Sequence, residues 1–110
     1  MIEKIIMDFL NEHLSVPVEM EKPEDELDEY VLIEKTGSSE SDYIKSATFA
    51  VQSYSTSLYK ACVLNEDVKG AMNNLISLPM ISKAKLNTDY NFTDTTTKRY
   101  RYQAIYDITY

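Results

Sequence analysis

The chain has 110 residues, a formal net charge of −7, 44% hydrophobic residues and 26% charged residues. These values are typical of one folded domain and disfavour a disordered, collagen-like or coiled-coil chain. No apolar run reaches the roughly 18 residues of a membrane-spanning helix, and Met1-Ile2-Glu3-Lys4 does not begin a signal peptide. We therefore expect one soluble domain over residues 1–110, made and kept in the cytoplasm.

The first predicted element is an amphipathic helix near the N-terminus. Its apolar residues recur at intervals of three and four: Ile2, Ile5, Ile6, Phe9, Leu10 and Leu14. The helix should end near Ser15, because Pro17 disfavours helical geometry at Val16. Residues 16–20 then alternate between apolar and polar positions beside a proline, which predicts a short strand at a sheet edge.

Two strand-like runs follow an acidic loop over residues 21–29. Residues 30–35 and 43–54 are rich in β-branched and aromatic residues, and residues 36–42 have the composition of a turn. The runs predict a β-hairpin. Phe49 and Val51 share a face of its second strand and are predicted to lie in the core.

A second helix of about 20 residues is predicted after the hairpin. Serines 53, 55 and 57 are candidate N-caps, and Pro79 bounds the helix. Asn65 could restart it as a second cap, so two shorter helices remain an alternative. We expect Leu58 to join Ile6, Phe9 and the two hairpin residues in the core between helices and sheet.

Residues 81–90 and 100–110 predict two further strands joined by a polar segment. The order is then α-β-β-β-α-β-β, without the alternation of strands and helices that builds parallel sheets. We therefore predict an α+β fold, a mainly antiparallel sheet with helices packed on one face.

The residues needed for common catalytic chemistry are scarce. The chain has one cysteine, Cys62, one histidine, His13, and two glycines, and so it cannot form an internal disulfide or a glycine-rich phosphate cradle. We expect Cys62 to be buried and inert, and His13 to lie at a core edge or helix end. The sequence predicts no catalytic, metal or cofactor-binding residue, and hence a protein that is not an enzyme.

One segment has a partial calcium-binding pattern. Asn87, Asp89 and Asn91 have the alternating spacing of oxygen ligands. A calcium loop of this kind needs glycine at the sixth position and glutamate at the twelfth, where this chain has Phe92 and Lys98. We therefore predict no calcium site.

Charge is distributed unevenly along the chain. Residues 1–42 hold thirteen acidic and three basic residues, a balance of −10, whereas residues 43–110 hold five acidic and eight basic residues, a balance of +3. Opposite charges on opposite flanks suit head-to-tail association, although an acidic run is also a common solvated surface. The candidate interface residues are Glu24, Asp25, Glu26, Asp28 and Glu29 on the acidic side and Lys83, Lys85, Lys98, Arg99 and Arg101 on the basic side.

Tyrosine is the compositional oddity of this chain. Residues 99–110 contain four of the nine tyrosines and both arginines, and the chain has no tryptophan. Tyrosine and arginine are enriched at protein interfaces, which adds Tyr100 and Tyr102 to the candidates. Ordinary pairing of aromatic residues across a sheet explains the pattern equally well.

In their order along the chain, these segments resemble one protein family. The segments are Met1-Ile2-Glu3-Lys4-Ile5-Ile6, Val16-Pro17-Val18, residues 30–37, residues 47–54 leading into Ser57-Leu58-Tyr59, and residues 100–106. Together they resemble the tail terminator, or tail-to-head joining, proteins of long-tailed bacteriophages, in phages and prophages of Gram-positive bacteria. The resemblance spans nearly the whole chain but carries no catalytic motif.

The resemblance implies an α+β subunit of a homo-oligomeric ring, typically a hexamer. Such a ring is a structural part of the virion, in the tail or neck, and is assembled in the host cytoplasm. It caps the tail tube, ends polymerisation of the major tail tube protein, and offers the surface where the head-completion protein attaches. DNA passes through its channel only as cargo, and no membrane is involved. No individual residue role is carried over.

Two other functions fit the same sequence. Another neck component, such as a head-completion or minor capsid protein, would use a similar small α+β subunit. A small non-enzymatic regulator that binds a host protein is the other alternative. A gene position beside that of the major tail protein would favour the first interpretation over the regulator.

Overall fold

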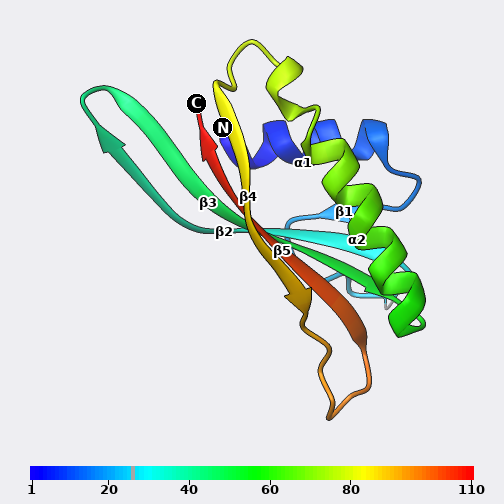
Figure 1. Cartoon of the computed structure of the whole chain (residues 1–110). Helices are drawn as coiled ribbons and strands as arrows, with labels where there is room; N and C mark the ends of the chain where they lie inside the picture. Colours follow the sequence, from blue (N-terminus) through cyan, green and yellow to red (C-terminus); the bar gives the residue numbers. More distant parts are fainter. Residues whose placement is uncertain (26) are drawn as a thin grey trace.

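The structure of the chain is a computed structural model that describes residues 1–25 and 27–110. Figure 1 shows the elements in chain order. They are α1 (Ile2–His13), β1 (Val18–Glu19), β2 (Tyr30–Ser41), β3 (Ile44–Ser55), α2 (Leu58–Met72), the 3-10 helix η1 (Leu75–Ser77), β4 (Lys83–Asn91) and β5 (Tyr100–Thr109). The predicted α+β fold and element order are confirmed.

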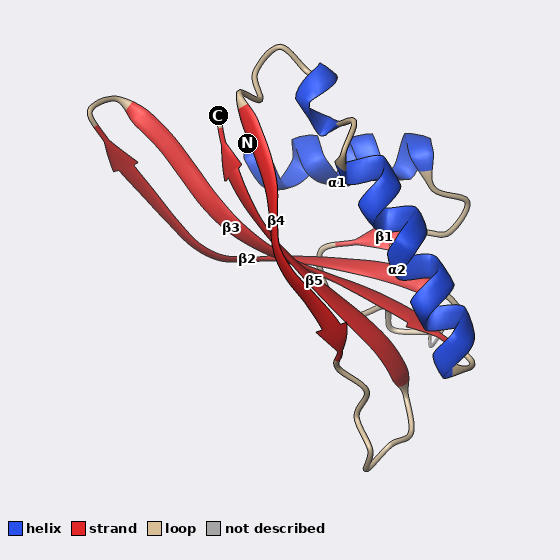
Figure 2. Ribbon diagram, viewed as in Figure 1, coloured by secondary structure: helices blue, strands red, loops and turns tan. Residues whose placement is uncertain are grey.

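The five strands form one sheet in the order β1-β2-β3-β5-β4. β1 is parallel to β2, whereas the other three neighbouring pairs are antiparallel. β1 is a short edge strand, as expected beside Pro17, and it pairs only with Val31 and Leu32 of β2. The helices lie on one side of this strongly twisted sheet (Figure 2).

The core lies between the helices and the sheet face that they cover. Alternate residues of the central strands supply the sheet side, where Phe49 pairs with Tyr106 and Val51 with Ala104. The predicted burial of Ile6, Phe9, Phe49 and Val51 is confirmed. The prediction for Leu58 was wrong, because its side chain is 41% exposed. Leu58 is the first residue of α2, and the buried stripe of that helix begins one turn later at Ala61.

The β2–β3 hairpin is longer than predicted. Its turn is only Asp42-Tyr43, because Ser41 already pairs with Ile44. Residues 36–41, expected to form the turn, instead extend β2 as a strand. They were missed because every residue from 34 to 45 is exposed. A strand that buries neither face has no alternation of apolar and polar residues to reveal it.

α2 is a single helix, which resolves the alternative of two shorter ones. Ser57 is its N-cap, and its hydroxyl accepts a hydrogen bond from the Lys60 amide at 3.1 Å. Asn65 does not start a second helix, since it lies in the middle of the continuous helix Leu58–Met72, where it is buried. Cys62 is half-buried rather than fully buried. His13 ends α1 as expected, with Nδ1 2.8 Å from the carbonyl oxygen of Phe9.

Among the described residues, no helix has the length and apolar character needed to cross a membrane.

Candidate functional site

The most prominent surface feature is the outer part of the β2–β3 hairpin, residues 36–46, which we call the arm. Figure 1 shows the arm projecting from the body of the domain. The two strands of the arm pair with each other. The neighbouring strand β5 pairs with β3 only at the base of the arm, where Thr109 lies opposite Ser46. An exposed, mostly polar hairpin of this length adds little to the core, so its sequence is free to serve contacts outside the domain.

The sheet has two edges that no strand of the described chain covers. One is β2 beyond Leu32, where β1 ends, and the other is the outer side of β4. Unpaired strand edges present rows of backbone donors and acceptors that can pair with another chain. Both edges carry an irregularity, between Lys35 and Gly37 in β2 and between Leu86 and Thr88 in β4. Such bulges restrict which partner strand can pair in register.

The two edges carry opposite charges. Lys83 and Lys85 on β4 are exposed, and neither forms an ion pair with a described residue. Glu34, Glu40 and Asp42 on the β2 side are also exposed without such a pair. The candidates Lys83 and Lys85 are therefore available for contact with a second molecule.

The acidic loop, residues 21–29, contacts Arg99, one of the basic candidates, within the same chain. The Arg99 guanidinium donates hydrogen bonds to the carbonyl oxygens of Leu27 and Asp28, the second at 3.1 Å. It also lies 5.6 Å from the centre of the Tyr30 ring. Arg99 thus helps to fasten the loop against the sheet, a contact across 71 residues that the sequence did not reveal.

The other acidic candidates surround this attachment. Glu24, Asp25 and Asp28 are exposed and Glu29 is half-buried. Glu26, also predicted as an interface residue, lies outside the described residues. The exposed carboxylates remain candidates for contact with another molecule, whereas Arg99 already has partners in its own chain.

Arg101 is likewise engaged within the chain. Its Nη1 donates to the Tyr54 hydroxyl at 2.8 Å, and its Nε donates to the Phe92 carbonyl oxygen at 2.6 Å. The guanidinium also lies 4.5 Å from the centre of the Phe92 ring. Replacing either arginine by glutamate would therefore disturb the fold, so such variants cannot test assembly alone.

The remaining predicted candidates lie in three different settings. Lys98 is exposed in the turn before β5, with a positive φ of 55°. Tyr100 is half-buried at the start of β5 opposite Ser55. Tyr102 faces α2, where a hydrogen bond with the Cys62 thiol raises its pKa. Tyr102 thus belongs to the contact between sheet and helix, whereas Lys98 is exposed and forms no ion pair with a described residue.

The sheet face opposite the helices holds a polar network that sequence reasoning missed. Gln52 donates to Gln103 at 2.7 Å, and the Tyr54 hydroxyl donates to Gln52 at 2.9 Å. Gln103 in turn donates to the Tyr90 hydroxyl. The only sequence signal was the alternation of these polar side chains with core residues along their strands, which does not specify partners.

β4 is tied to α2 by an ion pair. Lys69 lies 2.9 Å from the Asp89 carboxylate and 3.0 Å from that of Glu66, and Asn65 also donates to Asp89 at 2.9 Å. The Lys69 ammonium holds the pKa of Asp89 below its ordinary value, and Asp89 in turn raises the pKa of Lys69. Asp89 therefore serves the packing of an edge strand. Over the described residues, no group of three or more His, Cys, Asp or Glu could hold a metal ion.

Over the described residues, the exposed features are thus an arm, two uncovered sheet edges and charges of both signs without an ion pair. Comparison with known proteins adds no further indication of function. No protein-family model matches the chain, and no curated protein matches it.

Proposed function

We propose that the chain is a structural protein of a long-tailed bacteriophage, a tail terminator whose copies form a ring on the tail tube. The ring would end polymerisation of the tube and offer the surface to which the head attaches. The starting point is the resemblance in segment order and length, and the α+β arrangement agrees with the fold expected for that family. The proposal includes no enzymatic activity and no cofactor.

The observation that carries the ring is the pair of uncovered sheet edges. β2 and β4 lie at opposite edges of the sheet. They run antiparallel to each other, because the three strand pairs that connect them, β2–β3, β3–β5 and β5–β4, are all antiparallel. A rotation about an axis along the strands therefore brings β4 of one copy beside β2 of the next in antiparallel orientation. Such a contact joins two different surfaces, and it closes into a ring when the rotation divides a full turn.

Charge supports the same orientation. Lys83 at the start of β4 would approach Glu40 and Asp42 at the end of the β2 side of the next copy, because the pairing registers place these residues at the same end of the sheet. Exposed charges of this kind mainly steer association and suppress wrong partners, while buried contacts supply most of the affinity.

The sheet face without helices suits the channel side of such a ring. The amides of Gln52 and Gln103 bond each other, and the Thr48 hydroxyl donates to Asp107 at 3.0 Å. On this face Arg101 is held by Tyr54 and Phe92. Lys83 and Lys85 share the face through their register partners Thr109 and Asp107, and they lie at the β4 edge, where the acidic β2 side of the next copy would cover them. Few cations would then remain for DNA phosphates. DNA would pass along it as cargo without strong binding.

The proposal is tested in a phage that encodes this protein. Deleting the gene should give tail tubes of irregular length without heads, and adding the purified protein should restore a defined length and head joining. Electron microscopy reads both outcomes. Tails of normal length in the deletion strain would contradict the proposal. Normal tails that fail to join heads would instead indicate head completion, and unchanged virions would favour a host regulator.

Charge reversal at the edge tests the orientation of the ring. The double variant Lys83→Glu with Lys85→Glu should stay folded but lose assembly, and Glu40→Lys on the facing strand should partly restore it. Lys60→Glu on α2 is the matched control, since this lysine is also exposed but lies away from both edges. Assembly of the double variant at moderate salt would show that these charges only solvate the surface.

A further inference from the structure

The turn at the tip of the arm has an unusual residue. Asp42 and Tyr43 have φ angles of 51° and 67°, which is the pattern of a two-residue type I′ turn. Such turns favour Asn-Gly, because a bulky side chain is strained at positive φ. Tyr43 is nevertheless 98% exposed and so contributes nothing to the core. A tyrosine that neither favours its turn nor packs in its own domain indicates a contact outside the chain.

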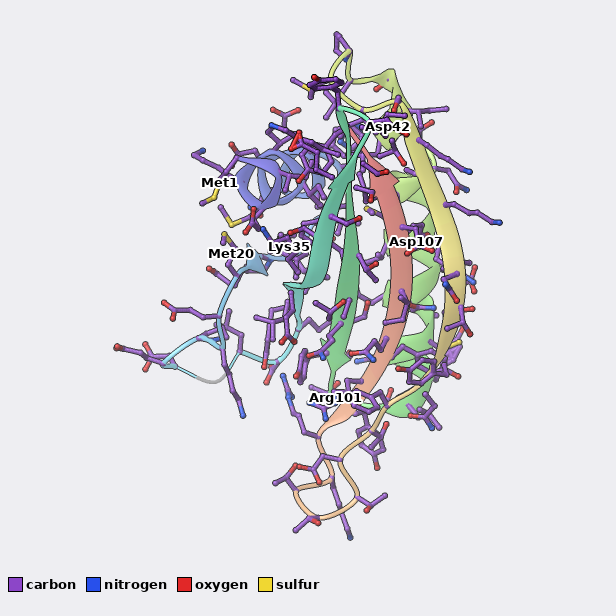
Figure 3. All side chains as sticks on the ribbon, turned by 90° about the vertical axis from the view of Figure 1, so that its left-hand side faces the viewer. Met1, Met20, Lys35, Asp42, Arg101 and Asp107 are labelled. Atoms are coloured by element: carbon purple, nitrogen blue, oxygen red, sulfur yellow. The ribbon has the colours of Figure 1, made fainter. Side chains whose placement is uncertain are left out.

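The tip is apolar as well as strained. Ile44 follows Tyr43 and is 59% exposed, so two large apolar side chains stand together at the end of the arm. Figure 3 shows Asp42 at this end of the hairpin, far from Arg101 at the opposite end of the sheet. A small exposed apolar tip of this kind can insert against a matching surface of a partner.

A second exposed apolar surface precedes β4. Ile76 on η1 is 58% exposed, and Met80, in the segment that leads into β4, is 50% exposed. We call this pair the shelf. Leu75 and Ile81, beside them in the sequence, are buried in the core, which anchors the shelf to the domain.

Sheet geometry relates the tip to the shelf of another copy. β2 ends and β4 begins at the same end of the sheet, on opposite edges, as Figure 1 shows. When the β2 edge of one copy pairs antiparallel with β4 of the next, the chain after β2 must lie beside the chain before β4. The first of these is the tip and the second is the shelf. The tip carboxylates Glu40 and Asp42 would then approach Lys83 of the neighbouring copy.

We infer that the tip of each arm, Tyr43 and Ile44, packs on the shelf, Ile76 and Met80, of the adjacent copy. This inference rests on the ring of the proposed function and adds the apolar contact that holds its subunits. The partner that binds the shelf is therefore a second copy of this chain. Its aromatic tip fits the apolar shelf, its β2 edge pairs antiparallel with β4, and its carboxylates Glu40 and Asp42 lie near Lys83.

The first test separates the stability of the turn from its role in assembly. The double variant Asp42→Asn with Tyr43→Gly supplies the preferred type I′ residues and removes the aromatic ring. It should be at least as stable as the wild-type protein in urea, yet its self-association should weaken by more than about tenfold. Tyr59→Ala is the matched control, because Tyr59 is 72% exposed on α2 away from the tip. Unchanged association of the double variant would overturn the inference.

The second test detects the contact directly. Two single-cysteine proteins, Tyr43→Cys and Met80→Cys, are made in a Cys62→Ser background, mixed on purified tail tubes, and treated with a short bismaleimide. Crosslinked dimers should form in the mixture but in neither protein alone, and Tyr59→Cys mixed with Met80→Cys should give none. Rings without the crosslink would refute the tip contact while the proposed function stands. The absence of any ring would refute the proposed function, and this inference with it.

Discussion

Replacing Phe49 by alanine tests whether the core is organised around the centre of β3. Phe49 is fully buried, and its neighbours across the strands are Lys35 on β2 and Tyr106 on β5. Removing a buried phenylalanine ring loses its transfer free energy and leaves a cavity, which together cost about 3–5 kcal/mol. The surrounding sheet cannot close this cavity easily, because hydrogen-bonded strands hold β3 on both sides.

This loss is large for a domain of 110 residues. Domains of this size have unfolding free energies of about 5–15 kcal/mol, so the variant keeps a fraction of its stability. At about 4 °C for each kcal/mol, the melting temperature should fall by about 12–20 °C. The native α+β structure should persist at low temperature, since the remaining core residues still cover the sheet.

Urea unfolding followed by circular dichroism measures the effect. The slope of the unfolding free energy against urea should match that of the wild-type protein, which shows that both unfold from equally compact states. Tyr59→Ala serves as the control, because an exposed tyrosine should change stability by less than about 0.5 kcal/mol. A Phe49→Ala change below about 1 kcal/mol would show that the packing of this face is misunderstood.

Three further predictions concern packing, helix propensity and bound groups. Lys69 lowers the pKa of Asp89, so the charged carboxylate stabilises the fold at pH values above its ordinary pKa of 3.8. This stabilisation is lost as the pH falls through the lowered pKa. In the Asp89→Asn variant, the urea midpoint should therefore fall less steeply with pH below about pH 4. Gly70→Ala should stabilise α2 by about 0.5–1 kcal/mol in thermal melts, since a Cβ there meets no atom within 4 Å; destabilisation would reveal an unseen contact. Mass spectrometry and elemental analysis of the purified protein should find no stoichiometric metal or nucleotide, and either one would contradict a purely structural role.

Local patterns in the sequence were sufficient for most elements and for the buried face of the sheet. The spacing of Ile6 and Phe9 predicted α1, and the alternation around Phe49 and Val51 identified their common face. Ser57 was among the predicted caps of α2. These features were readable because each depends on residues a few positions apart, whose periodicity follows from the geometry of a helix or a strand.

Burial at element ends and the length of the arm required the tertiary structure. Leu58 has the right spacing for the stripe of α2, yet it lies at the helix end and stays exposed. Residues 36–41 have the composition of a turn, yet they form a strand. Their strand conformation comes from backbone pairing with β3 rather than from burial, and pairing leaves no periodic pattern in an exposed segment.

The candidate site divides in the same way. The sequence by itself located the charges of both signs, and Lys83 and Lys85 are exposed as a contact surface requires. Only the tertiary structure showed that Arg99 is held by the acidic loop of its own chain and that the β2 and β4 edges remain uncovered. The physical reason is that whether a charge or a strand edge is free depends on which distant segment of the chain folds against it. The pattern of neighbouring residues in the sequence contains no information about such long-range contacts.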